Sequence, residues 1–293
     1  METITIFRVF GLRRSGNHVF INWLLSQIDG HVRFFNNVYP NDPELNPPDK
    51  EFGKSKLNKY IVLSFEDRNL DLVGPQKWIR YYSKSETINV VDFLVHRSAM
   101  NVFASRVKSN MTKPLFFSGM SIPELYWQYI CYSESRKFWK KKFGTELIVV
   151  EFEKFISSES EKSLICDQTN LNYVPVKLNC VDVRYGGGSS FRPGDKQAPS
   201  LEQLNSRWKS AVKDPQFLSW VSELNAISNS NKIEGWEEQF NILVKEGFSI
   251  PEFHVARWKT TLKRYVVYFV LWLRNSNFIT RVRQLFRHRP YHT

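Results

Sequence analysis

The chain has 293 residues and a formal net charge of +12 at pH 7, and this length is sufficient for one large domain with its own hydrophobic core. Its apolar fraction of 42% and charged fraction of 24% exclude a disordered or fibrous chain and are typical of a globular protein. The three cysteines form no CxxC pair, which argues against a disulfide scaffold or a zinc site and indicates a reducing compartment.

The positive charge is concentrated at the C-terminal end of the sequence. From position 254 onward there are nine Lys or Arg residues and no acidic residue, so the first 253 residues carry 32 basic and 29 acidic side chains. We therefore predict a near-neutral domain over 1–250 and a basic helical tail over 251–293. Aromatic and basic residues alternate in this tail as they do in helices that lie on membrane surfaces, but a helix packed on the domain would have the same pattern.

The sequence begins with a β-like pattern rather than a signal peptide, and its longest apolar run, 265–273, is too short to span a bilayer. We expect a cytoplasmic protein, and peripheral contact with the cytoplasmic membrane face through the tail is an open alternative. Nucleic acid is not an expected partner, because the charge belongs to the tail and no recognition module is present.

Short apolar runs alternate with helical patterns in the first half of the chain. Strands are predicted over 4–10, 60–65, 88–95 and 146–152, and helices over 17–28 and from a capping box at 121–124 to position 144. Loops are predicted over 36–56 and 186–191, and a helical remainder follows a second capping box at 200–203. This alternation predicts an α/β fold, with a parallel sheet covered by helices on both faces.

The turn between the first strand and the first helix reads Gly11-Leu-Arg-Arg-Ser-Gly16. Glycines at this spacing let successive backbone N–H groups turn inward around an anion, and the following helix adds its N-terminal N–H groups. In magnesium-dependent nucleotide sites the next two residues are Lys and Ser or Thr, whereas here they are Asn17 and His18. The turn therefore predicts an anion site that uses Arg13 and Arg14 instead of a metal; a turn with solvated arginines is the structural alternative.

A second strand that continues into a helix carries Arg97 and, eight residues later, Ser105. Ligands of open parallel sheets bind outside the carboxyl ends of the strands, so both residues are candidates for the same site. The structural alternative is an ion pair between Arg97 and Asp92, or a contact of Arg97 with a helix C-terminus.

Together, these two elements resemble the cofactor loops of the sulfotransferases that use 3′-phosphoadenosine 5′-phosphosulfate (PAPS). In that family the first loop binds the 5′-phosphosulfate and usually reads P-K-S-G-T, so that Arg14 occupies its lysine position. The second loop binds the 3′-phosphate through an Arg and a Ser, which match Arg97 and Ser105. The resemblance implies a P-loop-type fold and transfer of a sulfuryl group, without a metal, to the hydroxyl or amine of a small-molecule, carbohydrate or lipid acceptor.

Two further segments resemble the same family. The run 146–153 is similar to its strand that ends in an aromatic residue and a carboxylate, and 188–192 is similar to the late glycine-rich loop that closes over the nucleotide. The departures are Arg for Lys in the first loop, Asn17 and His18 for the usual hydroxyl residues, and a late loop without the common Lys-Gly or Gly-Arg pair. The cofactor-binding residues that the resemblance implies are Arg13, Arg14, Ser15, Gly16, Asn17, His18, Arg97, Ser105, Gly188, Ser189, Ser190, Phe191 and Arg192.

The acceptor must lose its proton to a base within hydrogen-bond reach. Glu66, at the end of the 60–65 strand, is the first candidate, because members of the family carry a catalytic His or Glu there, and His18 in the first loop is the second. Arg14 is expected to stabilise charge on the leaving phosphate. A loop salt bridge of Glu66 and Asp67 with Arg68 is the structural alternative.

Two other functions fit the same features. A magnesium-dependent P-loop kinase would use Glu66 and Asp67 as metal ligands, although the Lys-Ser/Thr pair is missing. A non-enzymatic protein that binds anions or a membrane surface would depend on the basic tail. Binding of adenosine 3′,5′-bisphosphate without metal separates the sulfotransferase from the kinase.

Overall fold

The computed structural model describes residues 3–38, 50–52, 59–68, 87–108, 122–176, 206–215, 217–218, 221–222, 225 and 236–245. Several predicted features lie outside these ranges: both capping boxes in whole or in part, the late loop with Gly188, Ser189, Ser190, Phe191 and Arg192, the boundary near 250 and the basic tail. These features therefore stay predictions.

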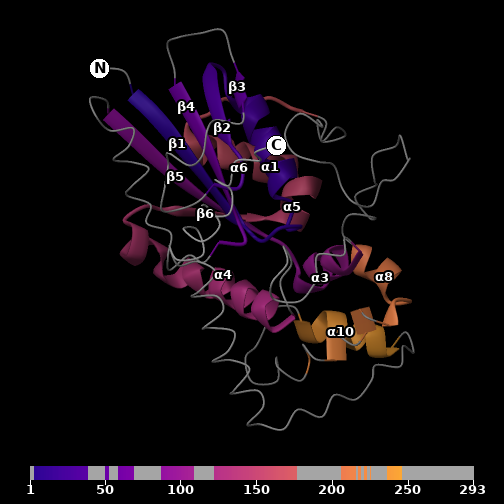
Figure 1. The fold of residues 1–293 in the computed structure, drawn as a ribbon. Helices are drawn as coiled ribbons and strands as arrows, with labels where there is room; N and C mark the ends of the chain where they lie inside the picture. Colours follow the sequence, from indigo (N-terminus) through magenta and orange to yellow (C-terminus); the bar gives the residue numbers. More distant parts are fainter. Residues whose placement is uncertain are drawn as a thin grey trace, which may run out of the picture.

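A six-stranded sheet with the order β3-β2-β4-β1-β5-β6 forms the centre of the fold (Figure 1). Its strands are β1 (Thr3–Gly11), β2 (His31–Phe35), β3 (Lys50–Phe52), β4 (Lys59–Glu66), β5 (Thr87–His96) and β6 (Leu147–Glu151). Strands β2, β4, β1, β5 and β6 are parallel, and the edge strand β3 pairs with β2 in the antiparallel direction. The predicted α/β fold with a parallel sheet is confirmed.

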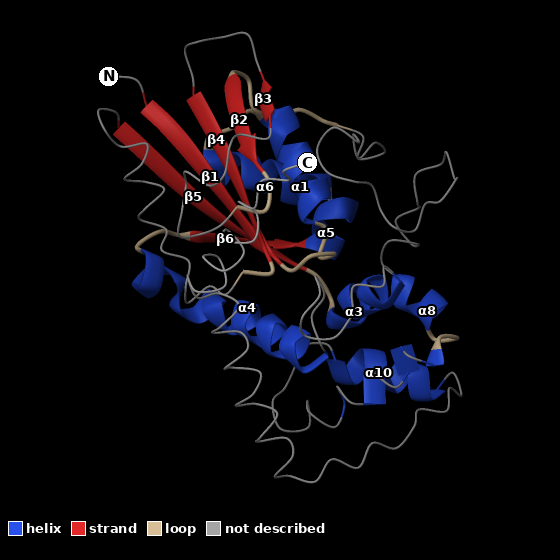
Figure 2. Ribbon diagram, viewed as in Figure 1, coloured by secondary structure: helices blue, strands red, loops and turns tan. Residues whose placement is uncertain are grey.

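Helices cover both faces of this sheet (Figure 2). The helices of the described residues are α1 (Asn17–Gln27), α3 (Ala99–Lys108), α4 (Ile122–Phe143), α5 (Phe152–Ser157), α6 (Glu159–Thr169), α8 (Arg207–Ala211) and α10 (Trp236–Lys245). Helices α1, α5 and α6 lie on one face and α4 on the other, while α8 and α10 pack against α3 beyond the carboxyl ends of the strands. On β1, Phe7 and Val9 face α1, α5 and α6, whereas Ile6 and Phe10 face the layer that contains α3 and α4. Within the described residues, none of these helices combines the length and the apolar character needed to cross a membrane.

Most predicted elements are found close to their expected positions, and two strands were missed. Strands β1, β4 and β5 and helices α1 and α4 match their predicted ranges within about two residues, while β6 ends at Glu151 because Phe152 already begins α5. Strand β2 was not predicted, and β3 lies inside the segment 36–56 that was predicted as a loop. Both are short, and five or three residues provide too little periodicity to distinguish a strand from a loop.

The carboxyl ends of β1, β4 and β5 meet at one edge of the sheet. Gly11 at the end of β1 is in register with Glu66 of β4 and with Val95 of β5. In the strand order, β2 and β4 lie to one side of β1, and β5 and β6 lie to the other side, so the order reverses at β1. Open α/β sheets bind ligands at such a reversal of strand order. We therefore expect a ligand site in the loops that follow β1, β4 and β5.

A buried ion pair joins β1 to β5 on the α4 face of the sheet. Arg8 and Asp92 are in register, and neither side chain is exposed. Arg8 donates through two nitrogens to the two Asp92 oxygens at 2.6 and 2.7 Å, and Asp92 also accepts from Trp139 of α4 at 2.8 Å and from Thr145. Buried charges need such two-point geometry and extra donors to offset their loss of water. Asp92 forms its ion pair with Arg8, so the predicted alternative of an ion pair between Arg97 and Asp92 is wrong.

Replacing only one partner of this pair should be more damaging than replacing both. Asp92→Ala leaves a buried, uncompensated guanidinium and should lower the free energy of unfolding by about 3–5 kcal/mol. The double variant Arg8→Met/Asp92→Leu leaves no buried charge at this position and should lose clearly less. Urea unfolding followed by tryptophan fluorescence measures both, and equal losses in the two variants would contradict this account.

Candidate functional site

Side chains of the turn after β1 hold its backbone in place. The backbone nitrogen and the hydroxyl of Ser15 donate to the Leu12 carbonyl at 3.0 and 2.7 Å, and the Asn17 amide donates to the same oxygen at 3.2 Å. A Cβ on Gly11 would lie 2.1 Å from the Asn17 side-chain oxygen. The first glycine of the motif is therefore needed because the Asn17 amide fills the space beside it.

Two residues of this turn have a left-handed backbone. Gly16 has a φ of 103° and Arg14 has a φ of 75°, a conformation that costs about 1 kcal/mol or more for a residue with a side chain. At Gly16, a Cβ would also lie 2.1 Å from the Phe152 ring. The turn leads directly into α1, whose first N–H groups have no partner within the helix and favour an anion.

The two adjacent arginines have different surroundings. Arg13 Nε lies 3.5 Å from Glu66 Oε2 and 3.8 Å from Asp67 Oδ2. Arg14 forms no ion pair with any described residue, and its buried Nε has no hydrogen-bond partner among them. Burial lowers the pKa of Arg14; the positive charges of Arg106 and Arg13 add to this effect, and the negative charge of Glu66 opposes it. Arg14 is therefore a strained, partly buried cation with hydrogen-bonding capacity for a ligand.

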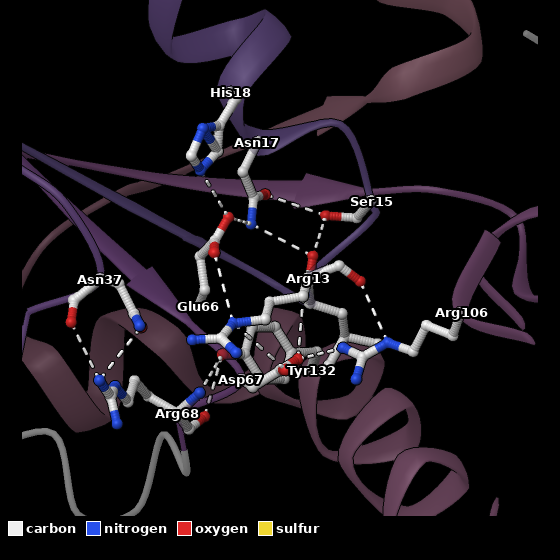
Figure 3. A network of polar contacts seen from close by, with 11 residues as sticks. Arg13, Ser15, Asn17, His18, Asn37, Glu66, Asp67, Arg68, Arg106 and Tyr132 are labelled. Atoms are coloured by element: carbon white, nitrogen blue, oxygen red, sulfur yellow. Dashed lines mark hydrogen bonds and ion pairs between the residues drawn. The ribbon is translucent and has the colours of Figure 1, made fainter. Parts of the chain in front are cut away.

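Glu66 contacts three side chains of the turn and of the start of α1 (Figure 3). Its Oε1 lies 3.1 Å from His18 Nε2 and accepts from Asn17 Nδ2 at 3.3 Å, while Oε2 faces Arg13 Nε. The two residues predicted as alternative bases, Glu66 and His18, are thus direct neighbours. Each affects how the other is oriented.

Asp67 connects the end of β4 to the β1 turn and to α3. Its Oδ1 accepts from the backbone N–H of Arg13 at 2.9 Å and forms an ion pair with Arg106, whose Nε donates to the Arg13 carbonyl at 3.2 Å. Burial alone would raise the pKa of Asp67, but the charge of Arg106 and these hydrogen bonds outweigh it and hold the pKa below its usual value. Next to it, Arg68 donates to the backbone and side-chain oxygens of Asn37 at 2.9 and 3.1 Å.

Arg97 lies at the end of β5, directly beside the first turn. Its side chain is 2% exposed, donates to the Arg14 carbonyl at 3.2 Å, and stacks over Phe152 with 4.8 Å to the ring centroid. Its Nε lies 3.8 Å from Glu153 Oε1. Burial lowers the pKa of Arg97 to about 10, with Glu153 opposing this shift, so the side chain is charged at neutral pH. The two predicted cofactor loops are therefore in contact.

Ser105 lies within α3, and its buried hydroxyl has no hydrogen-bond partner among the described residues. A buried hydroxyl without a partner is unfavourable, so a ligand or water that reached it would be stabilised. The next residue, Arg106, contacts the Arg13 carbonyl. This part of α3 thus lies close to the β1 turn.

Sequence reasoning missed the residues that support the site from behind. Arg106 positions the turn, Phe152 packs under Gly16 and Arg97, and Glu153 accepts from the Ser98 backbone N–H at 3.2 Å as well as facing Arg97. A signal was present for Arg106, because it is a charged residue next to Ser105 in a helix that is apolar over much of its length. The other two, Phe152 and Glu153, lie in the segment 146–153 that resembles the family's strand end, but no role was predicted for them, and in the structure they begin α5.

A second polar cluster lies at the ends of β5 and β6. His96 Nδ1 lies 3.2 Å from Glu151 Oε2, its Nε2 lies 3.4 Å from Ser133 Oγ, and Arg136 lies 3.0 Å from Glu151 Oε1. This order of atoms matches that of a serine hydrolase triad. Ser133 lies in the middle of α4, however, where the helix itself uses the backbone N–H groups that an oxyanion hole would need. The cluster therefore serves to join β5, β6 and α4.

Comparison with protein-family models gives no match, and comparison with curated proteins gives no significantly similar sequence. Among the described residues, no group of three or more His, Cys, Asp and Glu side chains is arranged to hold a metal ion. The geometry of the β1 turn and its neighbours is thus the basis for assigning a function.

The lowered pKa of Asp67 predicts how stability depends on pH. Because the folded-state pKa lies below that of the unfolded chain, the contribution of Asp67 is present above the unfolded value and is lost as the pH falls through the folded value. Urea unfolding at about pH 5 and about pH 3 should show a larger loss of stability for the wild type than for Asp67→Asn. The exposed Asp29→Asn is the matched control, and an Asp67→Asn variant that behaves like this control would contradict the prediction.

Proposed function

We propose that this chain is a sulfotransferase that uses PAPS as its sulfuryl donor. One observation carries the proposal: Arg14, a partly buried cation without a carboxylate partner among the described residues, occupies a left-handed turn at the start of α1. This turn lies where parallel sheets bind ligands, and its N–H groups favour an anion. A planar guanidinium that stays charged suits two oxygens of a phosphosulfate.

The proposed assignments follow the two loops. Arg14, together with Arg13, the side chains of Asn17 and His18 and the backbone N–H groups of 16–18, would bind the 5′-phosphosulfate, since the N–H of Ser15 already donates to the Leu12 carbonyl. Arg97 and Ser105 would bind the 3′-phosphate. The buried Ser105 hydroxyl, which has no partner among the described residues, and the charged state of Arg97 at neutral pH support this part. The late loop 188–192 is proposed to close over the nucleotide.

In the proposed reaction, a bond forms between the acceptor oxygen or nitrogen and sulfur as the bond from sulfur to the bridging phosphate oxygen breaks. Arg14 would stabilise the charge that develops on the leaving phosphate. Glu66, whose Oε1 lies 3.1 Å from His18 Nε2 in the ligand-free protein, would accept the acceptor's proton. The products are the sulfated acceptor and adenosine 3′,5′-bisphosphate, and the chain's own cations provide the charge stabilisation.

The alternative kinase fits the same geometry less well. A magnesium ligand requires accessible carboxylate oxygens, whereas Asp67 Oδ1 accepts from the backbone N–H of Arg13 and pairs with Arg106. A protein that only binds anions would also need the cations of the turn, but it would not need the carboxylate of Glu66 beside them. The sulfotransferase is therefore the function that the site supports best.

Titration calorimetry with adenosine 3′,5′-bisphosphate in the presence of a chelator tests the proposal. We expect binding by the wild type, at least about tenfold weaker binding by Arg14→Ala because a charge-assisted contact is lost, and intermediate binding by Arg14→Lys. The exposed Arg33→Ala on β2 is the matched control and should bind like the wild type. Binding only of ATP with Mg²⁺ would refute the proposal in favour of the kinase. Labelled PAPS offered with carbohydrate, lipid and amine acceptors would then identify the substrate class.

A further inference from the structure

The carboxylate of Glu66 occupies the donors that an anionic ligand of the β1 turn would need. Its three partners are Asn17 Nδ2 at 3.3 Å, His18 Nε2 at 3.1 Å and Arg13 Nε at 3.5 Å. All three belong to the turn or to the first residues of α1. The side chain of Glu66 is 11% exposed, so these contacts lie in a partly desolvated place where electrostatic interactions are strong.

We propose that Glu66 acts as an internal anion that fills the turn in the ligand-free protein and leaves when the phosphosulfate binds. This inference rests on the proposed function for the identity of the anion and for the role of Glu66 as base, whereas competition between Glu66 and a ligand requires only that the ligand is an anion. Two negative groups at one set of donors repel each other, and a ligand whose binding-competent state is only partly populated binds correspondingly more weakly. The wild-type affinity for anions is thus set below what the turn alone would provide.

The contacts of the two neighbouring carboxylates indicate why Glu66, rather than Asp67, is the group that moves. The partners of Glu66 are side chains at 3.1 to 3.5 Å. Asp67 instead binds a backbone N–H at 2.9 Å and the buried Arg106. Glu66 is able to leave by rotating its side chain, whereas movement of Asp67 would disrupt the turn itself.

The displacement of Glu66 also links binding of the sulfuryl donor to proton transfer. While Glu66 is bound to its three donors, both of its carboxylate oxygens face the turn and are not available to an acceptor. Once the ligand takes over these donors, the carboxylate is free to accept the acceptor's proton. Glu66, the proposed base, is therefore released only when the sulfuryl donor PAPS is bound.

Titration calorimetry with Glu66→Gln tests the internal anion directly, with inorganic pyrophosphate and adenosine 3′,5′-bisphosphate as separate probes. We expect both probes to bind about tenfold more tightly than to the wild type, since a competing group that occupies the donors in about nine of ten molecules reduces affinity by that factor. Glu134→Gln is the matched control. It removes the same charge from an exposed position on α4 that pairs with Lys137, and it should leave both affinities unchanged.

The outcomes separate this inference from the proposed function. If the nucleotide binds the wild type and Glu66→Gln equally well, or binds the variant more weakly, the sulfotransferase proposal stands and the internal anion is refuted. If the nucleotide binds neither protein, the sulfotransferase proposal fails; tighter pyrophosphate binding by the variant would still support the internal anion, and unchanged binding would refute it.

A measurement on the wild type covers the case in which the variant does not fold. The imidazole signals of His18, assigned by their loss in His18→Gln, report its contact with Glu66 in long-range ¹H–¹⁵N spectra. We expect saturating pyrophosphate to shift the His18 Nε2 resonance as Glu66 leaves. A resonance that stays in place while pyrophosphate binds would refute the displacement.

Discussion

The hydrogen bond between the backbone N–H of Arg13 and the Asp67 carboxylate, at 2.9 Å, fixes the β1 turn relative to the rest of the sheet edge. Asp67 in turn is bound by Arg106 of α3, and Arg106 also donates to the Arg13 carbonyl. The peptide groups on both sides of Arg13 are therefore held from two elements that are distant in sequence. Without this arrangement, neither the direction of Arg14 nor the position of Glu66 relative to α1 would be defined.

A second set of contacts supports the other half of the turn. Phe152 packs against Gly16 and under the guanidinium of Arg97, which donates to the Arg14 carbonyl. The end of β6 thus determines how closely the end of β5 approaches the turn. A site that depends on four strand ends cannot be assembled from the β1 turn alone, which explains why a G-x-x-x-x-G spacing is by itself a weak indication of function.

An interaction is predictable from the sequence when its partners are close to each other along the chain. The turn, α1 and the long strands follow from local patterns: Gly11 and Gly16 frame the turn, and β-branched and aromatic residues fill β1 and β5. The partners of Glu66 and Asp67 were not predictable in the same way, because Arg106 lies 39 residues beyond Asp67 and no periodic pattern links them. The pairing of Arg8 with Asp92, 84 residues apart, was hidden for the same reason.

The internal anion also accounts for the unusual pair of adjacent arginines. If Glu66 and a phosphosulfate alternate at the same donors, then one cation is needed to neutralise the carboxylate before the ligand arrives, and another is needed for the ligand itself. Arg13 faces Glu66 at the end of β4 and Asp67 directly after it, whereas Arg14 forms no ion pair with a described residue. When Glu66 leaves, Arg13 loses one of its two acidic neighbours and becomes available to the ligand beside Arg14. A single lysine would have to neutralise the carboxylate and bind the ligand in turn, whereas two arginines provide a separate cation for each.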